Sequence, residues 1–207
     1  MTSPKIRLAV MAAVSALALT ACDSEPTPPV TGTSTTPIPS TPTDPENQAP
    51  KVRNPLDIKK FVDDPCSSLT ATQLADLKLI DPEVNRGDDA YEAEVGCNYN
   101  LNPKNTLTAY VNYFPRIKNG LTYIYTDRRP ATPSPHWTPT EIDGFPAVVH
   151  APSKDRTRCH VDVGTSDTTF FDVTYYYYDW NDWDGRDTCA AAKSIATAVL
   201  TTIKAAN

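Results

Sequence analysis

The sequence predicts an α+β domain, in which a mostly antiparallel sheet of about six strands has one helix before it and one helix after it. Two observations support this fold class. Between residues 95 and 178, apolar residues repeatedly alternate with polar ones, which is the pattern of a strand with one buried face. Helical patterns lie on either side of this region, and helices that are segregated from the strands along the chain are typical of α+β folds.

The first helix is expected to begin in the sequence Thr70-Ala71-Thr72-Gln73. This is a capping box, in which the Thr70 hydroxyl accepts a hydrogen bond from the Gln73 amide and the Gln73 side chain reaches back to the Thr70 amide. We expect the helix to end before Asp81-Pro82, because proline disfavours helical geometry in the residue that precedes it.

Two alternating segments follow and predict a hairpin. One face of the first segment is formed by Val95, Cys97, Tyr99 and Leu101, and one face of the second by Leu107, Ala109, Val111 and Tyr113. Residues 102–105, with the sequence Asn-Pro-Lys-Asn, supply the turn. Residues 119–128 fit both a helical and a strand pattern, and we favour a short helix.

The rest of the sheet is predicted from four further segments. Asp143-Gly144 lies in the first of them, residues 141–145, and is a hairpin signal because both positions of a tight type I′ turn need positive φ. The other three are residues 147–150, 158–164 and 169–178. An amphipathic helix from Asp187 or Thr188 closes the chain, and its apolar stripe consists of Ala192, Ile195, Ala196, Val199 and Ile203.

Residues 1–21 have the features of a bacterial export signal. Lys5 and Arg7 give a positive n-region, and residues 8–19 are a run of apolar or small residues, too short for the ~20 residues of a membrane-spanning helix. The end of the segment, Leu19-Thr20-Ala21-Cys22, resembles the lipobox of bacterial lipoproteins. The resemblance implies that Cys22 becomes a diacylated N-terminus, which anchors the chain to the outer, extracytoplasmic face of the cell membrane.

A tether is expected between this anchor and the globular part. Residues 23–50 contain eight Pro, seven Thr and three Ser among 28 residues, and such a segment buries too little apolar surface to offset its ordering entropy. We expect lipidated Cys22 and a disordered tether over residues 22–53, acting as a passive spacer or carrying Thr-linked glycans. The globular domain is then residues 54–207, which is long enough for its own core.

Four cysteines remain in this domain: Cys66, Cys97, Cys159 and Cys189. Export favours disulfides, and the four residues lack the close spacing of zinc ligands, so we expect no metal and no cofactor. Four cysteines allow three connectivities. We favour Cys66 with Cys97 and Cys159 with Cys189, because each pair then ties a helix to a neighbouring strand.

Several of these motifs occur together in one known family. They are Asp64-Pro65-Cys66, Leu69-Thr70, Gln73-Leu74, Gly96-Cys97, Ile142-Asp143-Gly144, Pro146-Ala147 and Cys189-Ala190-Ala191. Over about residues 60–205 the chain resembles the actinobacterial lipoprotein family known as domain of unknown function 3558. The resemblance implies export, anchoring and disulfides, and it implies no activity. A more distant likeness to PsbP-type sensor and ligand-holding domains concerns the fold alone.

Composition and motifs exclude several function classes. The seven glycines never cluster into a phosphate-binding loop, and an acidic chain without a basic run is a poor partner for nucleic acid. The sequence has no H-E-x-x-H zinc helix and no G-x-S-x-G nucleophile elbow. We interpret His160 as a surface residue, since it lies on a strand beside a disulfide cysteine. The protein is therefore not expected to be an enzyme.

Aromatic residues gather in residues 170–183, which hold eight of the 18 in the chain. Alternation turns Phe171, Val173, Tyr175 and Tyr177 toward the core and their neighbours outward or toward a second layer. Exposed rings beside carboxylates suit the faces of sugars or peptides. The predicted contact surface consists of Tyr176, Tyr178, Trp180, Trp183 and Asp182; the alternative is that these rings pack under the terminal helix.

Together these features predict a cell-surface lipoprotein that acts as a non-enzymatic binding or accessory module. Its expected partners are the membrane, through the lipid anchor, and an envelope glycan, peptide or protein. Two alternatives stay open: an extracytoplasmic sensor or carrier for a small ligand, and an envelope enzyme that acts on glycan.

Replacement of the acylated residue tests the anchor. We expect Cys22→Ala to release the protein into the medium, because the variant has no thiol to carry the acyl chains. Immunoblots of membrane and medium fractions measure the release, and membrane retention of the variant would show that Cys22 is not the anchor.

Overall fold

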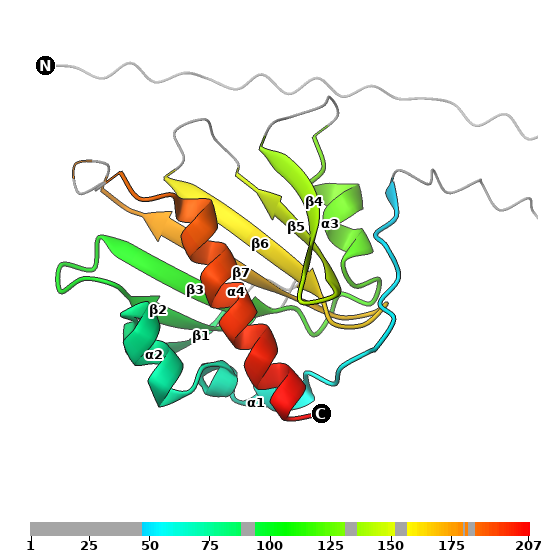
Figure 1. Cartoon of the computed structure of the whole chain (residues 1–207), viewed down its shortest axis with the longest axis horizontal. Helices are drawn as coiled ribbons and strands as arrows, with labels where there is room; N and C mark the ends of the chain where they lie inside the picture. Colours follow the sequence, from blue (N-terminus) through cyan, green and yellow to red (C-terminus); the bar gives the residue numbers. More distant parts are fainter. Residues whose placement is uncertain (1–46, 88–93, 131–135, 152–156, 180, 182–184) are drawn as a thin grey trace, which may run out of the picture. The chain divides into compact units, whose positions relative to one another are not determined.

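The computed structural model describes residues 47–87, 94–130, 136–151, 157–179, 181 and 185–207. The predicted signal peptide, Cys22, the tether up to residue 46, and Trp180, Asp182 and Trp183 lie outside the described residues. The described chain forms an α+β domain around one antiparallel sheet with the strand order β1-β2-β3-β7-β6-β5-β4 (Figure 1). The predicted fold class is confirmed.

The strands are β1 (Ile80–Arg86), β2 (Val95–Asn100), β3 (Leu107–Tyr113), β4 (Trp137–Ile142), β5 (Phe145–His150), β6 (Arg158–Gly164) and β7 (Phe170–Tyr177). The helices are α1 (Lys59–Asp63), the 3-10 helix η2 (Pro65–Ser68), α2 (Ala71–Leu77), α3 (Thr122–Asp127) and α4 (Thr188–Ala205). The two halves of the sheet are joined where β7 pairs with β3 on one side and with β6 on the other.

The sheet has seven strands where about six were predicted. The additional strand is β1, at the edge of the sheet, where Ile80 and Val84 are 40% and 47% exposed. Neither face of β1 is buried, so its sequence lacks the alternation that reveals the other strands. The single predicted N-terminal helix is also incomplete, because α1 and η2 precede α2.

Local signals in the sequence fix several of the turns and caps. In the capping box of α2, Thr70 and Gln73 bond reciprocally, with N···O distances of 3.3 and 2.7 Å. Asp143 and Gly144, with φ of 50° and 82°, form the two-residue turn between β4 and β5. Both predictions are confirmed, as is the short helix α3 within residues 119–128.

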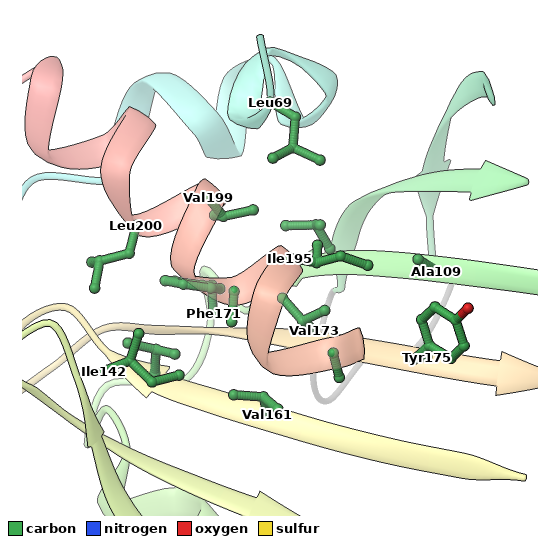
Figure 2. Close-up of a cluster of buried hydrophobic side chains, with 14 of the residues drawn as sticks. Leu69, Ala109, Ile142, Val161, Phe171, Val173, Tyr175, Ile195, Val199 and Leu200 are labelled. Carbon is green, nitrogen blue, oxygen red and sulfur yellow. The ribbon is translucent and has the colours of Figure 1, made fainter. Parts of the chain in front are cut away.

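Helix α4 crosses one face of the sheet and covers the main hydrophobic core (Figures 1 and 2). Its N-terminus is capped by Asp187, whose carboxylate accepts hydrogen bonds from the amides of Cys189 and Ala190. The predicted apolar stripe is buried, together with Leu200, against the inward side chains of β3, β6 and β7. These include Ala109, Val161, Phe171, Val173 and Tyr175 (Figure 2).

Both predicted cysteine pairs are disulfide-bonded. Cys66 in η2 is bonded to Cys97 in β2, and Cys159 in β6 is bonded to Cys189 in α4, with Cα–Cα distances of 5.0 and 5.1 Å. Each bond therefore ties a helix to the sheet, as the sequence predicts.

On the opposite face of the sheet, α3 is the helix among the described residues that covers it, and it does so at one end. A second apolar cluster lies there, in which Ile124 and Tyr125 of α3 join Phe114, Val148 and Phe170. The Phe114 and Phe170 rings are stacked, with centroids 4.9 Å apart. Beyond this cluster the same face carries polar residues.

The last residues of the predicted tether belong to the domain. The amide of Val52 donates to Asp167, 3.1 Å away, and the amide of Ala49 donates to Thr122, 3.3 Å away. Val52 is buried in the main core. Residues 49 and 52, which the sequence analysis places in the tether, thus contact the domain; in the sequence, Val52 is a single apolar residue among polar and proline-rich neighbours.

The two disulfides are expected to stabilise the domain about equally. Each joins residues about 30 apart, with sequence separations of 31 and 30. A closed loop of that length stabilises by about 3.6 kcal/mol in the chain-entropy model. The double variants Cys66→Ala/Cys97→Ala and Cys159→Ala/Cys189→Ala should each lose about that free energy of unfolding in urea titrations. A loss below about 1 kcal/mol for either pair would contradict this entropic role.

Candidate functional site

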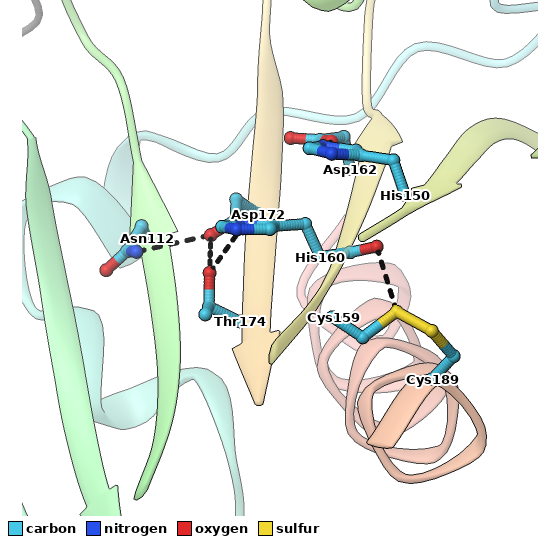
Figure 3. A network of polar contacts seen from close by, with 8 residues as sticks. All are labelled: Asn112, His150, Cys159, His160, Asp162, Asp172, Thr174 and Cys189. Atoms are coloured by element: carbon cyan, nitrogen blue, oxygen red, sulfur yellow. Dashed lines mark hydrogen bonds and ion pairs between the residues drawn. A yellow bond between two sulfur atoms is a disulfide. The ribbon is translucent and has the colours of Figure 1, made fainter. Parts of the chain in front are cut away.

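Three cross-strand rows of polar and aromatic residues cover the part of the sheet that faces away from α4 and lies beyond the α3 cluster. In register order the rows are Asn112–Asp172–Asp162, Tyr110–Thr174–His160–His150 and Tyr176–Arg158. Strand alternation produces this arrangement, because the residues between them point into the α4 core. The first two rows contain a buried set of polar groups, the His/Asp network, made of Asn112, His150, His160, Asp162, Asp172 and Thr174 (Figure 3).

Two histidine–aspartate pairs form the centre of the His/Asp network. His150 Nε2 lies 2.8 Å from Asp162 Oδ2, and His160 Nδ1 lies 3.2 Å from Asp172 Oδ2. Each pair is diagonal across neighbouring strands, and the two imidazole rings stack with centroids 4.8 Å apart. The histidine side chains are 11% and 13% exposed and the carboxylates 2% and 6%, so water screens these charges only weakly.

Asp172 is held in its charged form. Burial by itself raises the pKa of the carboxyl group, but the charge and hydrogen bond of His160 and the hydrogen bond from Thr174 outweigh it and hold the pKa below its ordinary value. The Thr174 hydroxyl donates to Oδ1 over 2.7 Å, and Asn112 Nδ2 donates to the same oxygen over 3.3 Å. Asp172 thus accepts from three side chains (Figure 3).

Asp162 differs from Asp172 although it lies beside it in register. Its pKa is raised above the ordinary value, chiefly by burial, and the neighbouring carboxylate of Asp172 adds to the rise. The hydrogen bond to His150 lowers the pKa but does not compensate. Within the described residues His150 is the one side chain that bonds to this carboxylate. The pKa values of two carboxyl groups in one network are therefore shifted in opposite directions.

Gly96 lies against Asn112, the first residue of the first row, and its lack of a side chain leaves space for the Asn112 amide. A Cβ atom at this position would lie 2.2 Å from Asn112 Oδ1 and 2.8 Å from the Val111 carbonyl oxygen, so a larger residue displaces both. Asn112 Oδ1 is buried without a hydrogen-bond partner, as is Asn98 Oδ1 on the neighbouring strand. Asn112 is thus held by its amide nitrogen on Asp172.

The His/Asp network does not form a nucleophile–histidine–aspartate relay. In such a relay the hydroxyl and the carboxylate contact opposite nitrogens of the imidazole. Here the Thr174 hydroxyl and Asp172 both contact Nδ1 of His160. Across the described part of the chain, no group of three His, Cys, Asp or Glu residues is arranged to hold a metal ion.

An exposed surface adjoins the network at the end of the sheet away from α3. We call it the aromatic surface: Arg158, Tyr110, Tyr176 and Tyr178. The Arg158 guanidinium lies 4.0 Å from the centre of the Tyr176 ring, and the Tyr176 and Tyr178 rings meet edge to face at 4.5 Å. The hydroxyls of Tyr110 and Tyr178 are hydrogen-bonded. Tyr178 is 55% exposed, whereas the other three are half-buried.

Two of the five residues of the predicted contact surface are among the described residues. Tyr176 and Tyr178 lie together, while Trp180, Asp182 and Trp183 lie outside the described residues. The alternative, in which the rings pack beneath the terminal helix, holds for Tyr175 and Tyr177, which are buried in the α4 core. Alternation along β7 therefore assigns successive tyrosines to different faces.

The interpretation of His160 as a surface residue was wrong. Its side chain is 13% exposed and bonded to Asp172 and Thr174, because β6 is an inner strand whose second face is also largely buried. The sequence analysis also missed Arg158, Tyr110, Asp162 and Asp172. A usable signal was present: polar residues recur at every second position in residues 158–162 and 172–174, opposite an apolar face.

A comparison with family models identifies the chain. The family described as "Protein of unknown function (DUF3558)" matches residues 17–202, which is most of the chain. The chain belongs to the DUF3558 family. No curated protein and no solved structure matches it. Because the DUF3558 description assigns no activity, function has to be argued from the geometry of the two sites above.

The described helices of this DUF3558 protein include none with the length and apolar character needed to cross a membrane. A hollow of about 220 Å³ borders His150 at the ends of β4 and β5 and is also lined by His136, Asp187 and Lys193. His150 of the His/Asp network thus forms part of the wall of this hollow.

Replacing a buried carboxylate by an amide should lower the free energy of unfolding by different amounts at Asp172 and Asp162. Asp172→Asn is expected to lower the free energy of unfolding at pH 7 by about 2 kcal/mol or more, because hydrogen bonds to a charged group are worth ~1.5–3 kcal/mol and three donors lose their charged acceptor. Asp162→Asn should cost less, because the variant removes a charge that burial disfavours. Urea titrations measure both.

The free energy of unfolding of the same two variants should also depend differently on pH. The folded pKa of Asp172 lies below its ordinary value of 3.8, so its stabilisation is complete above that pH and is lost as the pH falls through the folded pKa. The folded pKa of Asp162 lies above 3.8, so the contribution of this group to stability falls as the pH rises from 3.8 through the folded pKa, and Asp162→Asn lacks that contribution. Parallel pH profiles for wild type and both variants would contradict these directions.

Proposed function

We propose that this DUF3558 protein is a non-enzymatic binding module, carried on a lipid anchor at the extracytoplasmic face of the cell membrane, and that its ligand binds on the aromatic surface. The observation that carries the proposal is the position of Tyr178. It is among the few large apolar side chains of the described residues that are exposed, and its ring and hydroxyl are both held by other tyrosines.

An exposed ring in a fixed position is suited to binding. Ordering a flexible side chain on association costs about 0.5–1.5 kcal/mol, and a ring that is already held avoids much of that cost. Tyr178 is fixed by the edge-to-face contact with Tyr176 and by the hydroxyl of Tyr110. These partners lie on the central strands β7 and β3, which the core fixes in turn.

The chemistry of the neighbouring network supports a binding role over a catalytic one. Its single hydroxyl, on Thr174, is buried and donates to a carboxylate, so it is not poised to attack a substrate. The anchor is supported by the sequence alone, through Leu19-Thr20-Ala21-Cys22 and the Pro/Thr/Ser-rich segment that follows. Such a tether would place the domain in contact with envelope glycans, peptides and proteins.

Tyr178→Ala tests the proposal. We expect binding of the full chain to isolated envelopes of the producing cells to weaken about tenfold or more, since loss of an aromatic anchor commonly costs more than 1.4 kcal/mol of binding. Stability should change little, because the ring is 55% exposed. Cosedimentation measures the binding, and circular dichroism measures the stability.

Val84→Ala is the matched control, because Val84 is also an exposed apolar residue but lies on the edge strand β1. This variant should bind as the wild type does. Equal binding by Tyr178→Ala and the wild type, or no binding by the wild type, would overturn the proposal.

A further inference from the structure

We infer that the aromatic surface selects an anionic ligand, a sugar acid, whose carboxylate binds Arg158 while its ring packs on Tyr178. The inference rests on the proposed function and names the ligand class of the same surface. Four observations carry it: the absence of an acidic partner for Arg158 among the described residues, the way its guanidinium is held, the hydroxyls beside it, and the neighbouring charged groups.

Arg158 has no acidic partner among the described residues, although the chain contains 25 acidic and 19 basic residues. Three lysines of the domain do have one: Lys51 is paired with Asp167, Lys59 with Asp63 and Lys204 with Asp143. The contact that the structure gives Arg158 is with the ring of Tyr176. In the part of the chain that the structure describes, no carboxylate therefore engages this guanidinium.

The Tyr176 ring holds Arg158 in a way that suits a carboxylate. The guanidinium carbon lies 4.0 Å from the ring centre, and the two residues are directly opposite in the pairing of β6 and β7. Guanidinium groups that lie over aromatic rings keep their N–H donors at the planar edge, which matches the two oxygens of a carboxylate. The side chain is half-buried, so fewer of its rotamers are lost on binding.

The pair of tyrosine hydroxyls supplies a further donor. One of the two hydroxyl hydrogens closes the bond between Tyr110 and Tyr178, and the other is left for a ligand. Burial, together with the bond to Tyr178, raises the pKa of Tyr110, and the nearby charge of Arg158 only partly offsets this. Tyr110 therefore stays protonated at neutral pH and retains its hydrogen.

The His/Asp network presents His160, and not a carboxylate, next to Arg158 in the register of the strands. His160 follows two residues later on the same face of β6, and it lies between Arg158 and the two buried carboxylates in the register of the strands. Asp172 is engaged by three donors and Asp162 by His150. The four residues of the aromatic surface are donors and rings, and the exposed carboxylate of Asp179 follows Tyr178 in the chain.

The exposed ring of Tyr178 indicates which kind of molecule carries the carboxylate. Sugar rings present apolar C–H faces that pack on aromatic rings, while their hydroxyls bond at the edges. A ligand that combines such a face with a carboxylate would satisfy Tyr178, Arg158 and the tyrosine hydroxyls at once. Inorganic phosphate would satisfy Arg158 alone.

The test is an NMR titration of the full chain at constant ionic strength with three probes: glucuronate, glucose and phosphate. Glucuronate should shift the Arg158 and Tyr178 side-chain signals saturably, and at least about tenfold more tightly than glucose or phosphate, since the bidentate charge-assisted contact needs the carboxylate and the packing needs the ring. Phosphate binding as tightly as glucuronate would overturn the sugar assignment.

Variants at Arg158 show whether the guanidinium is responsible. Arg158→Gln should abolish the preference for glucuronate over glucose, and Arg158→Lys should lose most of it, because lysine lacks the planar pair of donors. Arg53→Gln, at an exposed arginine elsewhere on the domain, should leave the preference unchanged. Thermal unfolding of each variant confirms that it is folded, and Arg158→Lys preserves the cation above Tyr176.

The outcomes distinguish this inference from the proposed function. If glucose and glucuronate shift Tyr178 equally, or if Arg158→Gln leaves the preference intact, the anionic ligand class is wrong and the binding surface stands. If no probe shifts Tyr178 while Tyr178→Ala still weakens envelope binding, the sugar acid is again overturned and the surface stands. If Tyr178 affects neither measurement, both are overturned.

Discussion

The packing of α4 against the sheet is the interaction on which the other features depend. It buries one face of β3, β7 and β6 beneath a single apolar stripe, and the disulfide between Cys159 and Cys189 fixes the start of the helix to the sheet. Because the core is complete on that side, the opposite face is free to carry groups that a core excludes. The buried charges and the exposed rings both lie on that opposite face.

The His/Asp network is costly in isolation, and its arrangement suggests what it contributes. Buried ion pairs seldom add net stability over apolar residues of the same volume, whereas they do penalise incorrect pairings. A shift of one residue between β5 and β6 would move His150 to the other face, away from Asp162, and leave a buried carboxylate without its partner. A slip of that kind between β5 and β6 is therefore penalised by the network.

The sequence predicted the features that are encoded locally. The stripe of α4, the Asp143-Gly144 turn and the capping box at Thr70 each depend on residues within a few positions, and each was confirmed. Strand β1 was not predicted, because an exposed edge strand has no buried face and so no alternation of apolar and polar residues. The disulfide pairing was accessible because each cysteine pair joins neighbouring elements.

The site was harder to predict, because it depends on strands that are distant in the chain. Alternation shows that His160 and Asp162 share a face, but not that His150 stacks on His160 or that Asp172 lies beside them. Those contacts follow from the pairing of β6 with β5 on one side and β7 on the other. Likewise, Arg158 meets Tyr176 only through the register of β6 and β7.

The N-terminal segment of the described chain joins the domain at the end of the sheet where β6 turns into β7. The bonds of Ala49 and Val52 to Thr122 and Asp167 hold residues 49–52 beside the turn that joins β6 to β7. The aromatic surface lies at the other ends of these strands, about 20 Å away at ~3.3 Å per residue. The rings and Arg158 therefore lie at the opposite ends of β6 and β7 from the segment by which the described chain enters the domain.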